Sequence, residues 1–190
     1  MEAFKARVHS FPPLADRRAT TLILGTMPGQ ASLSAGEYYA FDRNAFWNII
    51  EVHFGVARAA PYAQRCAALC AHGIALWDVL HSCSRDSSAD SDIVPDSIVA
   101  NDIGGFLREH PAVTRIYFNG ARAEALFTTH VRSGLGVEFS KVQYQRLPST
   151  SPANARVDLA GKIRVWSVIN NCLDDLRTSR QSAPTAARPD

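Results

Sequence analysis

The sequence predicts an α/β fold, built as a three-layer α/β/α sandwich around a central four-stranded, mainly parallel sheet. Four short runs rich in β-branched and aromatic residues alternate along the chain with segments of helical spacing. Glycine, proline and polar segments fall between them, where strands and helices end. This alternation favours parallel strands with helices on both faces, and we expect the four strands in the spatial order 2-1-3-4.

The expected strands come first, because the sheet positions everything else. They are residues 21–25 (TLILG), 74–79 (IALWDV), 115–119 (RIYFN) and 142–147 (VQYQRL). The first three are apolar enough to be buried on both faces. Helical spacing covers residues 45–54, 62–72, 97–110, 121–131 and 161–176, and residues 86–92 (DSSADSD) form a polar loop.

Length and composition indicate one globular domain. The chain has 190 residues, of which 46% are apolar and 20% charged, as in ordinary globular proteins. One well-buried core suffices at this length. We expect a single domain over residues 1–177 and a disordered tail over residues 178–190, which are rich in Ser, Ala, Pro and Arg.

Charge and apolar runs exclude little but favour a cytoplasmic protein. The formal net charge of +2 is too small to indicate a polyanionic partner by itself. No run approaches the roughly 20 apolar residues of a membrane span, and residues 1–10 lack the apolar stretch of a secretory signal. We therefore expect a cytoplasmic location and no membrane contact.

The four cysteines, Cys66, Cys70, Cys83 and Cys172, suit a reducing compartment. They form no C-x-x-C pair, and the nearby histidines do not complete a zinc spacing. We interpret them as structural thiols, with a metal or iron–sulfur site as the alternative. No metal and no cofactor are expected.

Unusual residues follow each expected strand. They are residues 25–29 (GTMPG), Asp78, the pair Asn119-Gly120, and residues 147–152 (LPSTSP). In an open α/β sheet, ligands bind beyond the carboxyl ends of the strands, so these four segments predict one site. For Asn119-Gly120 we favour a structural strand-to-helix turn over a role in the site.

Two of these segments resemble motifs of the uracil-DNA glycosylase superfamily, particularly its hypoxanthine-DNA glycosylase and mismatch-specific uracil/thymine-DNA glycosylase branches. The first motif is residues 25–29 followed by residues 38–47 (YYAFDRNAFW), and the second is residues 147–154 (LPSTSPAN). The resemblance covers about residues 20–175. It implies a monomeric, monofunctional glycosylase that flips hypoxanthine, uracil or mismatched thymine out of double-stranded DNA and hydrolyses the N-glycosidic bond.

The resemblance assigns the contacts with the base to five residues. Gly25, Thr26 and Met27 would offer backbone amides to a base carbonyl. The alternative interpretation of this segment is an ordinary strand-to-loop turn. Tyr39 matches the aromatic residue on which the base stacks, with core packing as the alternative. Asp78 would read the Watson–Crick edge. An ionised Asp only accepts hydrogen bonds, so it selects the ring N–H of uracil, thymine and hypoxanthine, which cytosine and adenine lack. Its alternative is a helix N-cap.

The expected catalytic residue is Asn44. Many relatives carry an Asp or Asn that positions the attacking water where this chain has Met27, and in the hypoxanthine branch that role falls to the residue matching Asn44. An amide can orient a water against the anomeric carbon if the glycosidic bond breaks first. Asp42, a carboxylate two residues earlier, is the second candidate, unless it faces solvent. Together Tyr39, Asp78 and Asn44 predict one cleft sized for a nucleobase.

The segment after the fourth strand would hold the DNA. The resemblance implies that Ser149, Thr150 and Ser151 grip phosphates around the flipped nucleotide. Ala153 and Asn154 occupy the position from which relatives insert a side chain into the emptied base stack. The alternative is an ordinary Ser- and Pro-rich surface loop.

Other functions have less support. The chain has three lysines, Lys5, Lys141 and Lys162, and none is expected in the base pocket, which argues against strand cleavage through a Schiff base. It has no G-x-S-x-G elbow and no P-loop. A non-catalytic nucleic-acid or nucleotide-binding module of the same fold is the remaining alternative.

Overall fold

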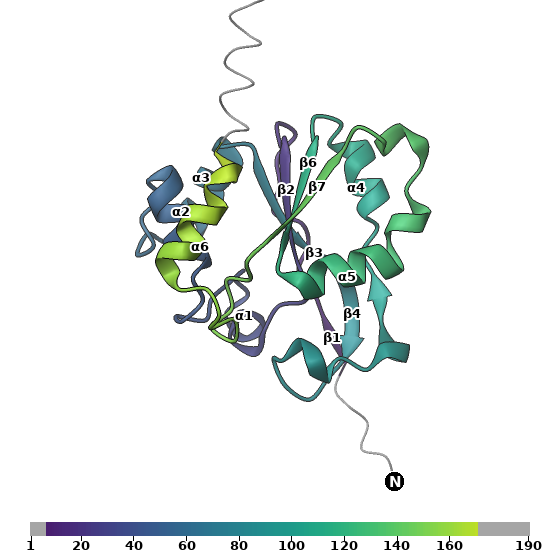
Figure 1. Ribbon diagram of the computed structural model, residues 1–190, viewed down its shortest axis with the longest axis horizontal. Helices are drawn as coiled ribbons and strands as arrows, with labels where there is room; N and C mark the ends of the chain where they lie inside the picture. Colours follow the sequence, from purple (N-terminus) through teal and green to yellow (C-terminus); the bar gives the residue numbers. More distant parts are fainter. Residues whose placement is uncertain (1–6, 171–190) are drawn as a thin grey trace, which may run out of the picture.

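A four-stranded parallel sheet forms the centre of the computed structural model, which describes residues 7–170 (Figure 1). Its strands are β2 (Thr21–Gly25), β3 (Ile74–Asp78), β6 (Arg115–Asn119) and β7 (Gln143–Leu147). They lie in the order β3-β2-β6-β7, and all three pairings are parallel. Numbered along the chain, these four strands have the predicted order 2-1-3-4.

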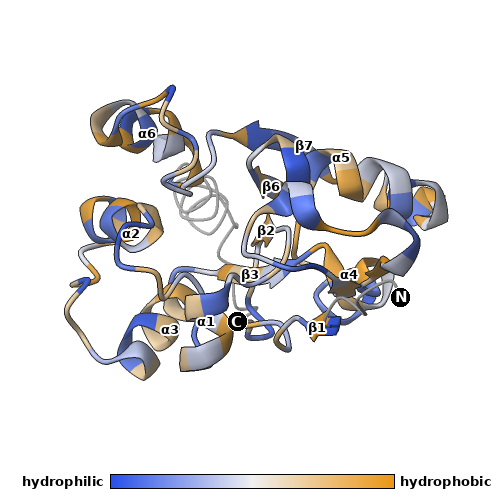
Figure 2. Cartoon of the chain, turned by 90° about the horizontal axis from the view of Figure 1, so that it is seen from below, coloured by the Kyte–Doolittle hydropathy of each residue, from blue (hydrophilic) through white to orange (hydrophobic). Residues whose placement is uncertain are grey.

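Side chains alternate between the two faces of this sheet. Leu22 and Leu24 of β2 belong to one buried cluster, whereas Ile23 belongs to another. The first cluster contains residues of α4 (Ile103–Glu109) and α5 (Ala121–His130), and the second contains residues of α2 (Phe46–Phe54), α3 (Tyr62–Ala71) and α6 (Leu159–Trp166). Figures 1 and 2 show the two groups of helices on opposite sides of the sheet. The predicted three-layer sandwich is confirmed.

Two helices begin or end away from their predicted limits. The helix predicted over residues 97–110 begins only at Ile103, because Asp102 caps it by accepting a 2.7 Å hydrogen bond from the Gly105 amide. The helix predicted over residues 161–176 begins earlier, at Leu159, after the Asp158 cap, and ends at Trp166. A short 3-10 helix follows α6, and residues from 171 onward lie outside the described part.

The structure contains a second, smaller sheet that the sequence did not predict. It is antiparallel and consists of β1 (Arg7–His9), β4 (Leu80–Ser84) and β5 (Val99–Ala100), in the order β1-β4-β5. Helix α1 (Gln30–Ala35) was not predicted either. Short 3-10 helices occur at Asp90–Asp92, Pro95–Ser97, Arg132–Gly134, Val137–Phe139 and Ser167–Ile169.

Some predictions concern residues that the structure does not describe. Cys172 and the tail over residues 178–190 are among them, and so is the predicted domain end at residue 177. Within residues 7–170, none of the helices is both long and apolar enough to cross a bilayer.

Candidate active site

The central feature of the site is the contact between Gly25 and Asp78, which lie opposite each other at the carboxyl ends of β2 and β3. A Cβ atom on residue 25 would overlap Oδ1 of Asp78 and would lie 3.3 Å from the Tyr39 hydroxyl. Glycine therefore lets two side chains converge on the end of β2. Because β4 rather than a helix follows Asp78, this residue is not a helix N-cap.

The backbone around Asp78 is held on both sides. The amides of Val79 and Leu80 donate to the carbonyls of Gly25 and Thr26, at 2.9 and 3.2 Å. The side-chain amide of Asn101 donates to the Asp78 carbonyl at 2.8 Å and to the Leu80 carbonyl at 3.0 Å. The position of the Asp78 backbone is thus fixed by the sheet and by the Asn101 side-chain amide.

The carboxyl group of Asp78 is buried and only partly satisfied. The residue is 4% exposed, and Oδ2 has no hydrogen-bond partner among the described residues. Burial, together with the charge of Asp90, raises the pKa of Asp78 to about 7, against the lowering effect of Arg85. The sequence predicts an ionised Asp78. With the pKa raised to about 7, a large fraction of this carboxyl group is neutral near pH 7.

Arg85 and Asp90 belong to the site although sequence reasoning placed neither there. Their segment folds back onto the loop after β2, where Arg85 donates to the Pro28 carbonyl and the Thr26 hydroxyl hydrogen-bonds to Asp90. The Ser88 hydroxyl accepts from the Gln30 amide at 2.8 Å. Residues 86–92 are therefore a wall of the site as well as the predicted polar loop.

Met27 and Thr26 face away from the expected base. Met27 is 7% exposed and packs in the core cluster on the α4 and α5 side. The Thr26 hydroxyl is taken by Asp90. The side chains of Thr26 and Met27 are thus engaged within the protein, and the predicted contact of this segment with a base would have to use its backbone.

Tyr39 has an unusual backbone conformation. Its φ angle of 57° is the one positive value of a non-glycine residue among those described, and an aromatic residue adopts it only under local constraint. Its ring stacks on Phe46 with centroids 4.0 Å apart. Its hydroxyl lies near Gly25 and hydrogen-bonds to the Asn119 side chain. Tyr39 thus combines core packing with a place at the site.

Asn119 connects three segments. Its side chain donates to the Thr150 hydroxyl at 2.9 Å and accepts from the Thr150 amide at 2.8 Å. The Thr150 carbonyl in turn accepts from the Ala45 amide at 2.9 Å, at the start of α2. The ends of β6 and β7 are therefore joined to the segment that carries Asn44.

Asn44 and Asp42 differ in their surroundings. Asn44 is half-buried, and its Oδ1 atom accepts from the Phe46 amide at 3.0 Å, which fixes the direction of the side chain. Asp42 is exposed, and its backbone carbonyl accepts from Arg58. Between the two candidates for positioning water, only Asn44 is held in a defined orientation.

Hydrogen bonds from two side chains of α6 hold the loop after β7 in place. Trp166 donates to the Pro148 carbonyl at 2.9 Å, and Lys162 donates to the Ser151 carbonyl at 3.2 Å. Thr150 is fully buried, whereas Ser149 and Ser151 are half-buried. The exposed part of this loop therefore has a fixed shape before any ligand binds.

Ala153 and Asn154 of this loop differ in the direction of their side chains. The Asn154 side chain turns back to donate to the Ser149 carbonyl at 3.2 Å, and Ala153 is exposed. Gly120 permits the close approach of Ser149, because a Cβ atom on residue 120 would lie 2.8 Å from the Ser149 Cβ atom.

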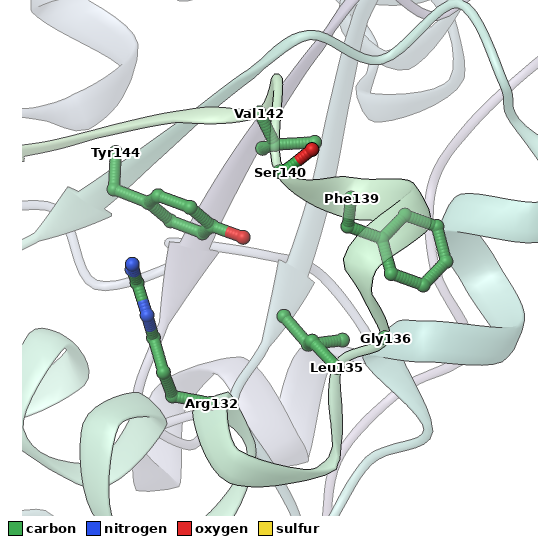
Figure 3. Close-up of a pocket in the computed structure, with 7 residues that line it drawn as sticks. All are labelled: Arg132, Leu135, Gly136, Phe139, Ser140, Val142 and Tyr144. Atoms are coloured by element: carbon green, nitrogen blue, oxygen red, sulfur yellow. The ribbon is translucent and has the colours of Figure 1, made fainter.

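The clearest cavities lie elsewhere. One of about 140 Å³ is formed by residues near the start of β7, and Figure 3 shows Arg132 beside Tyr144 on its wall. A second, of about 100 Å³, lies along β6 and β7. Neither is the base-sized cleft predicted between Tyr39, Asp78 and Asn44. At that place, Asp78 is covered and Tyr39 packs on Phe46.

Comparison with known proteins identifies the family. A sequence profile of the Uracil DNA glycosylase superfamily matches residues 12–172. The chain belongs to this superfamily. Two proteins named Hypoxanthine DNA glycosylase are similar to it. The protein from Methanosarcina acetivorans is 34% identical over 77% of this chain and 87% of its own length, and that from Methanosarcina barkeri is 31% identical over 60% and 71%.

A solved structure of the superfamily agrees with the fold. It is a solution NMR structure of a candidate uracil DNA glycosylase from Methanosarcina acetivorans, with a TM-score of 0.70 and 28% identity. The alignment covers 88% of this chain and 99% of the other. The resemblance found from the two motifs is thus confirmed along most of the uracil DNA glycosylase domain.

Proposed function

We propose that this protein is a monofunctional DNA glycosylase that removes hypoxanthine, and with lower preference uracil, from double-stranded DNA. The observation that carries the proposal is the buried Asp78 carboxyl group, which lies against Gly25 with Oδ2 unpartnered among the described residues. A buried polar atom without a partner is costly, and binding a base with a matching polar edge removes that cost. The names of both Methanosarcina relatives support hypoxanthine as the base.

Base recognition would use the corner between Tyr39 and Asp78. Phe46 covers one face of the Tyr39 ring, so the base would stack on the other. The Gly25 and Thr26 carbonyls already accept hydrogen bonds, so this loop would contact a base carbonyl through its backbone N–H groups and not through these two carbonyls. The corner is filled in the free protein, and a flipped base would enter as the segment carrying Tyr39 moves aside.

Hydrolysis would use a water held by Asn44. The Phe46 amide occupies one lone pair of Oδ1, and the second can accept a hydrogen bond from water, which directs the water oxygen at C1′. The C1′–N9 bond breaks with its electron pair moving to the base. The water oxygen then bonds C1′, and the proton that the water loses passes through solvent to the anionic base. The products are free hypoxanthine and an abasic sugar, and an amide suffices because the sugar is already electron-poor.

DNA binding would use the loop after β7. Ser149 and Ser151 would contact phosphates, and the exposed Ala153 would face the emptied base stack. The buried Thr150 would position this loop from inside, since its polar groups are bonded to Asn119 and Ala45. Asn154 would stabilise the conformation of this loop through its hydrogen bond to the Ser149 carbonyl.

Excision assays test this proposal. Duplex oligonucleotides carrying one inosine, uracil, xanthine or G·T mismatch are incubated with the protein without added metal, and abasic sites are revealed by alkali. We expect the fastest release from inosine and none from undamaged duplex. Binding of inosine duplex by folded protein without any excision would instead support the non-catalytic module.

A further inference from the structure

Two buried polar atoms close to the proposed base site have no hydrogen-bond partner within residues 7–170. They are Oδ2 of Asp78 and Nη1 of Arg85, whose residues are each 4% exposed. Asp90 interacts electrostatically with both residues and is fixed by the hydrogen bond from Thr26. Asp78, Arg85 and Asp90 therefore form a cluster of three ionisable groups, which we call the acid cluster.

The charges in the acid cluster act on Asp78 in opposite directions. The negative charge of Asp90 raises the pKa of Asp78, and the positive charge of Arg85 lowers it. Burial acts in the same direction as Asp90 and is the largest effect. Tyr38 and Tyr39, which also face Asp78, stay neutral because burial raises both of their pKa values. Burial raises the pKa of Asp90, and the hydrogen bond from Thr26 and the charges of Arg85 and Arg122 act against that rise.

We infer that Asp78 acts on the leaving base as a neutral carboxylic acid and that Asp90 is the positioning residue that keeps its proton in place. The inference rests on the proposed glycosylase function. A protonated carboxyl group offers one donor and one acceptor, which match O6 and N1–H of hypoxanthine. When the proton lies on the carboxyl oxygen that faces position 6, this O–H would meet the amino group of adenine. The other carboxyl oxygen would meet N1 of adenine, which carries no hydrogen.

The proton matters most as the glycosidic bond breaks. The electron pair of the C1′–N9 bond passes to the base, and its negative charge spreads to O6. An O–H donor at O6 stabilises this charge without giving up its proton, whereas a carboxylate in the same buried place would repel it. The neutral form of Asp78 is therefore the active one, and the rate falls as Asp78 ionises.

Substitutions in the acid cluster separate this role from a structural one. Single-turnover excision of inosine is measured from pH 5 to 9. In the natural protein the rate constant should fall about tenfold per pH unit above the Asp78 midpoint. Asp90→Asn should move the midpoint to lower pH, and Arg85→Gln should move it to higher pH. Asp78→Asn, whose amide donates and accepts at any pH, should lose the decline of the rate constant above neutral pH.

A matched control removes the same charge elsewhere. Asp96 is exposed, so Asp96→Asn should leave the pH profile unchanged. Carbon-13 NMR of the Asp78 carboxyl group, assigned by its absence in Asp78→Asn, provides a readout that does not depend on activity. Its titration midpoint should lie near 7 in the natural protein and at lower pH in Asp90→Asn.

The possible outcomes distinguish failure of the roles inferred for Asp78 and Asp90 from failure of the proposed glycosylase activity. Excision by the natural protein, together with an Asp90→Asn profile that equals the Asp96→Asn profile, would overturn the role of Asp90. An Asp78→Asn variant that still shows the decline of the rate constant above neutral pH would overturn the neutral-acid role and leave the glycosylase proposal standing. If the folded natural protein releases no base, the proposed function fails, and the inference fails with it.

Discussion

The side-chain amide of Asn119 holds Thr150 through two hydrogen bonds, one to its hydroxyl and one from its backbone amide. Thr150 is fully buried, and its carbonyl accepts from Ala45, next to Asn44. One side chain at the end of β6 therefore fixes both the proposed DNA-binding loop and the start of α2. The proposed water site and phosphate site share this support.

Loss of the Asn119 amide should damage both folding and excision. Asn119→Leu removes both bonds to Thr150 and should lower the free energy of unfolding by about 2 kcal/mol. The displaced loop should slow excision by on the order of tenfold or more. Urea unfolding and single-turnover rates measure the two effects. Thr150→Ser keeps the hydroxyl and the amide and serves as the control with near-natural values.

A methyl group at residue 25 should disable the site. Gly25→Ala would overlap Oδ1 of Asp78 and displace the carboxyl group, and we expect excision to fall by on the order of a hundredfold. Gly134→Ala is the matched control, because a Cβ atom there meets nothing within 4 Å. Equal rates in the two variants would contradict the base-reading role of Asp78.

Substitutions at Asn44 should separate capping from catalysis. Asn44→Ala loses the bond to the Phe46 amide, at about 1 kcal/mol of stability, and should lose excision while keeping DNA affinity. Asn44→Ser retains an oxygen that can cap the helix, so it should recover stability without recovering the rate. Asp42→Asn should behave like the natural protein, and a large rate loss there would transfer the role to Asp42.

The excised strand should stay intact. Lys162 is buried and donates to the Ser151 carbonyl, away from the base-binding residues, so it should not attack the abasic aldehyde. Strand cleavage should appear only after alkali, and borohydride should trap no covalent complex. A trapped complex that disappears in Lys162→Met would show lyase activity.

Asp78 should make folding less favourable as pH rises. An unfolded chain releases this proton near the ordinary pKa of 3.8, and the folded protein releases it at about 7. The stabilising contribution is therefore present in acid and is lost between these values, with a cost of about 4 kcal/mol at most above pH 7. Asp78→Asn should be more stable than the natural protein at pH 8, and this advantage should shrink toward pH 4, as urea unfolding at both pH values would show.

The sheet could be predicted because each strand carries a local signal. Residues 21–25 and 115–119 are short apolar runs, and the unusual residues that follow them fall at one edge of the sheet. The second sheet could not be predicted, because the polar strand β4 pairs with residues about 75 positions earlier. The same holds for the start of α4, where β5 replaces the expected first turn.

Part of the site also required the fold. Tyr39, Asp78 and Asn44 were found from motifs, and the structure brings Tyr39 and Asp78 together at Gly25. The turn preference of Asn-Gly predicts a structural role for Asn119, but its bonds to Thr150 could not be predicted, because the two residues lie 31 positions apart. Arg85 and Asp90 lack any local signal, and only the return of their segment onto residues 26–30 gives them a role.

The hydrogen bonds around Thr150 limit how the loop after β7 can be exchanged for that of a relative. Because Asn119, Thr150 and Ala45 hold one another, a loop exchanged from a relative carries its geometry only if the residue at the end of β6 is exchanged with it. Grafting the loop after β7 by itself would leave an orphaned amide beneath the new surface. A change of specificity through this loop should therefore require paired substitutions at the ends of β6 and β7, where Asn119 and Thr150 are bonded to each other.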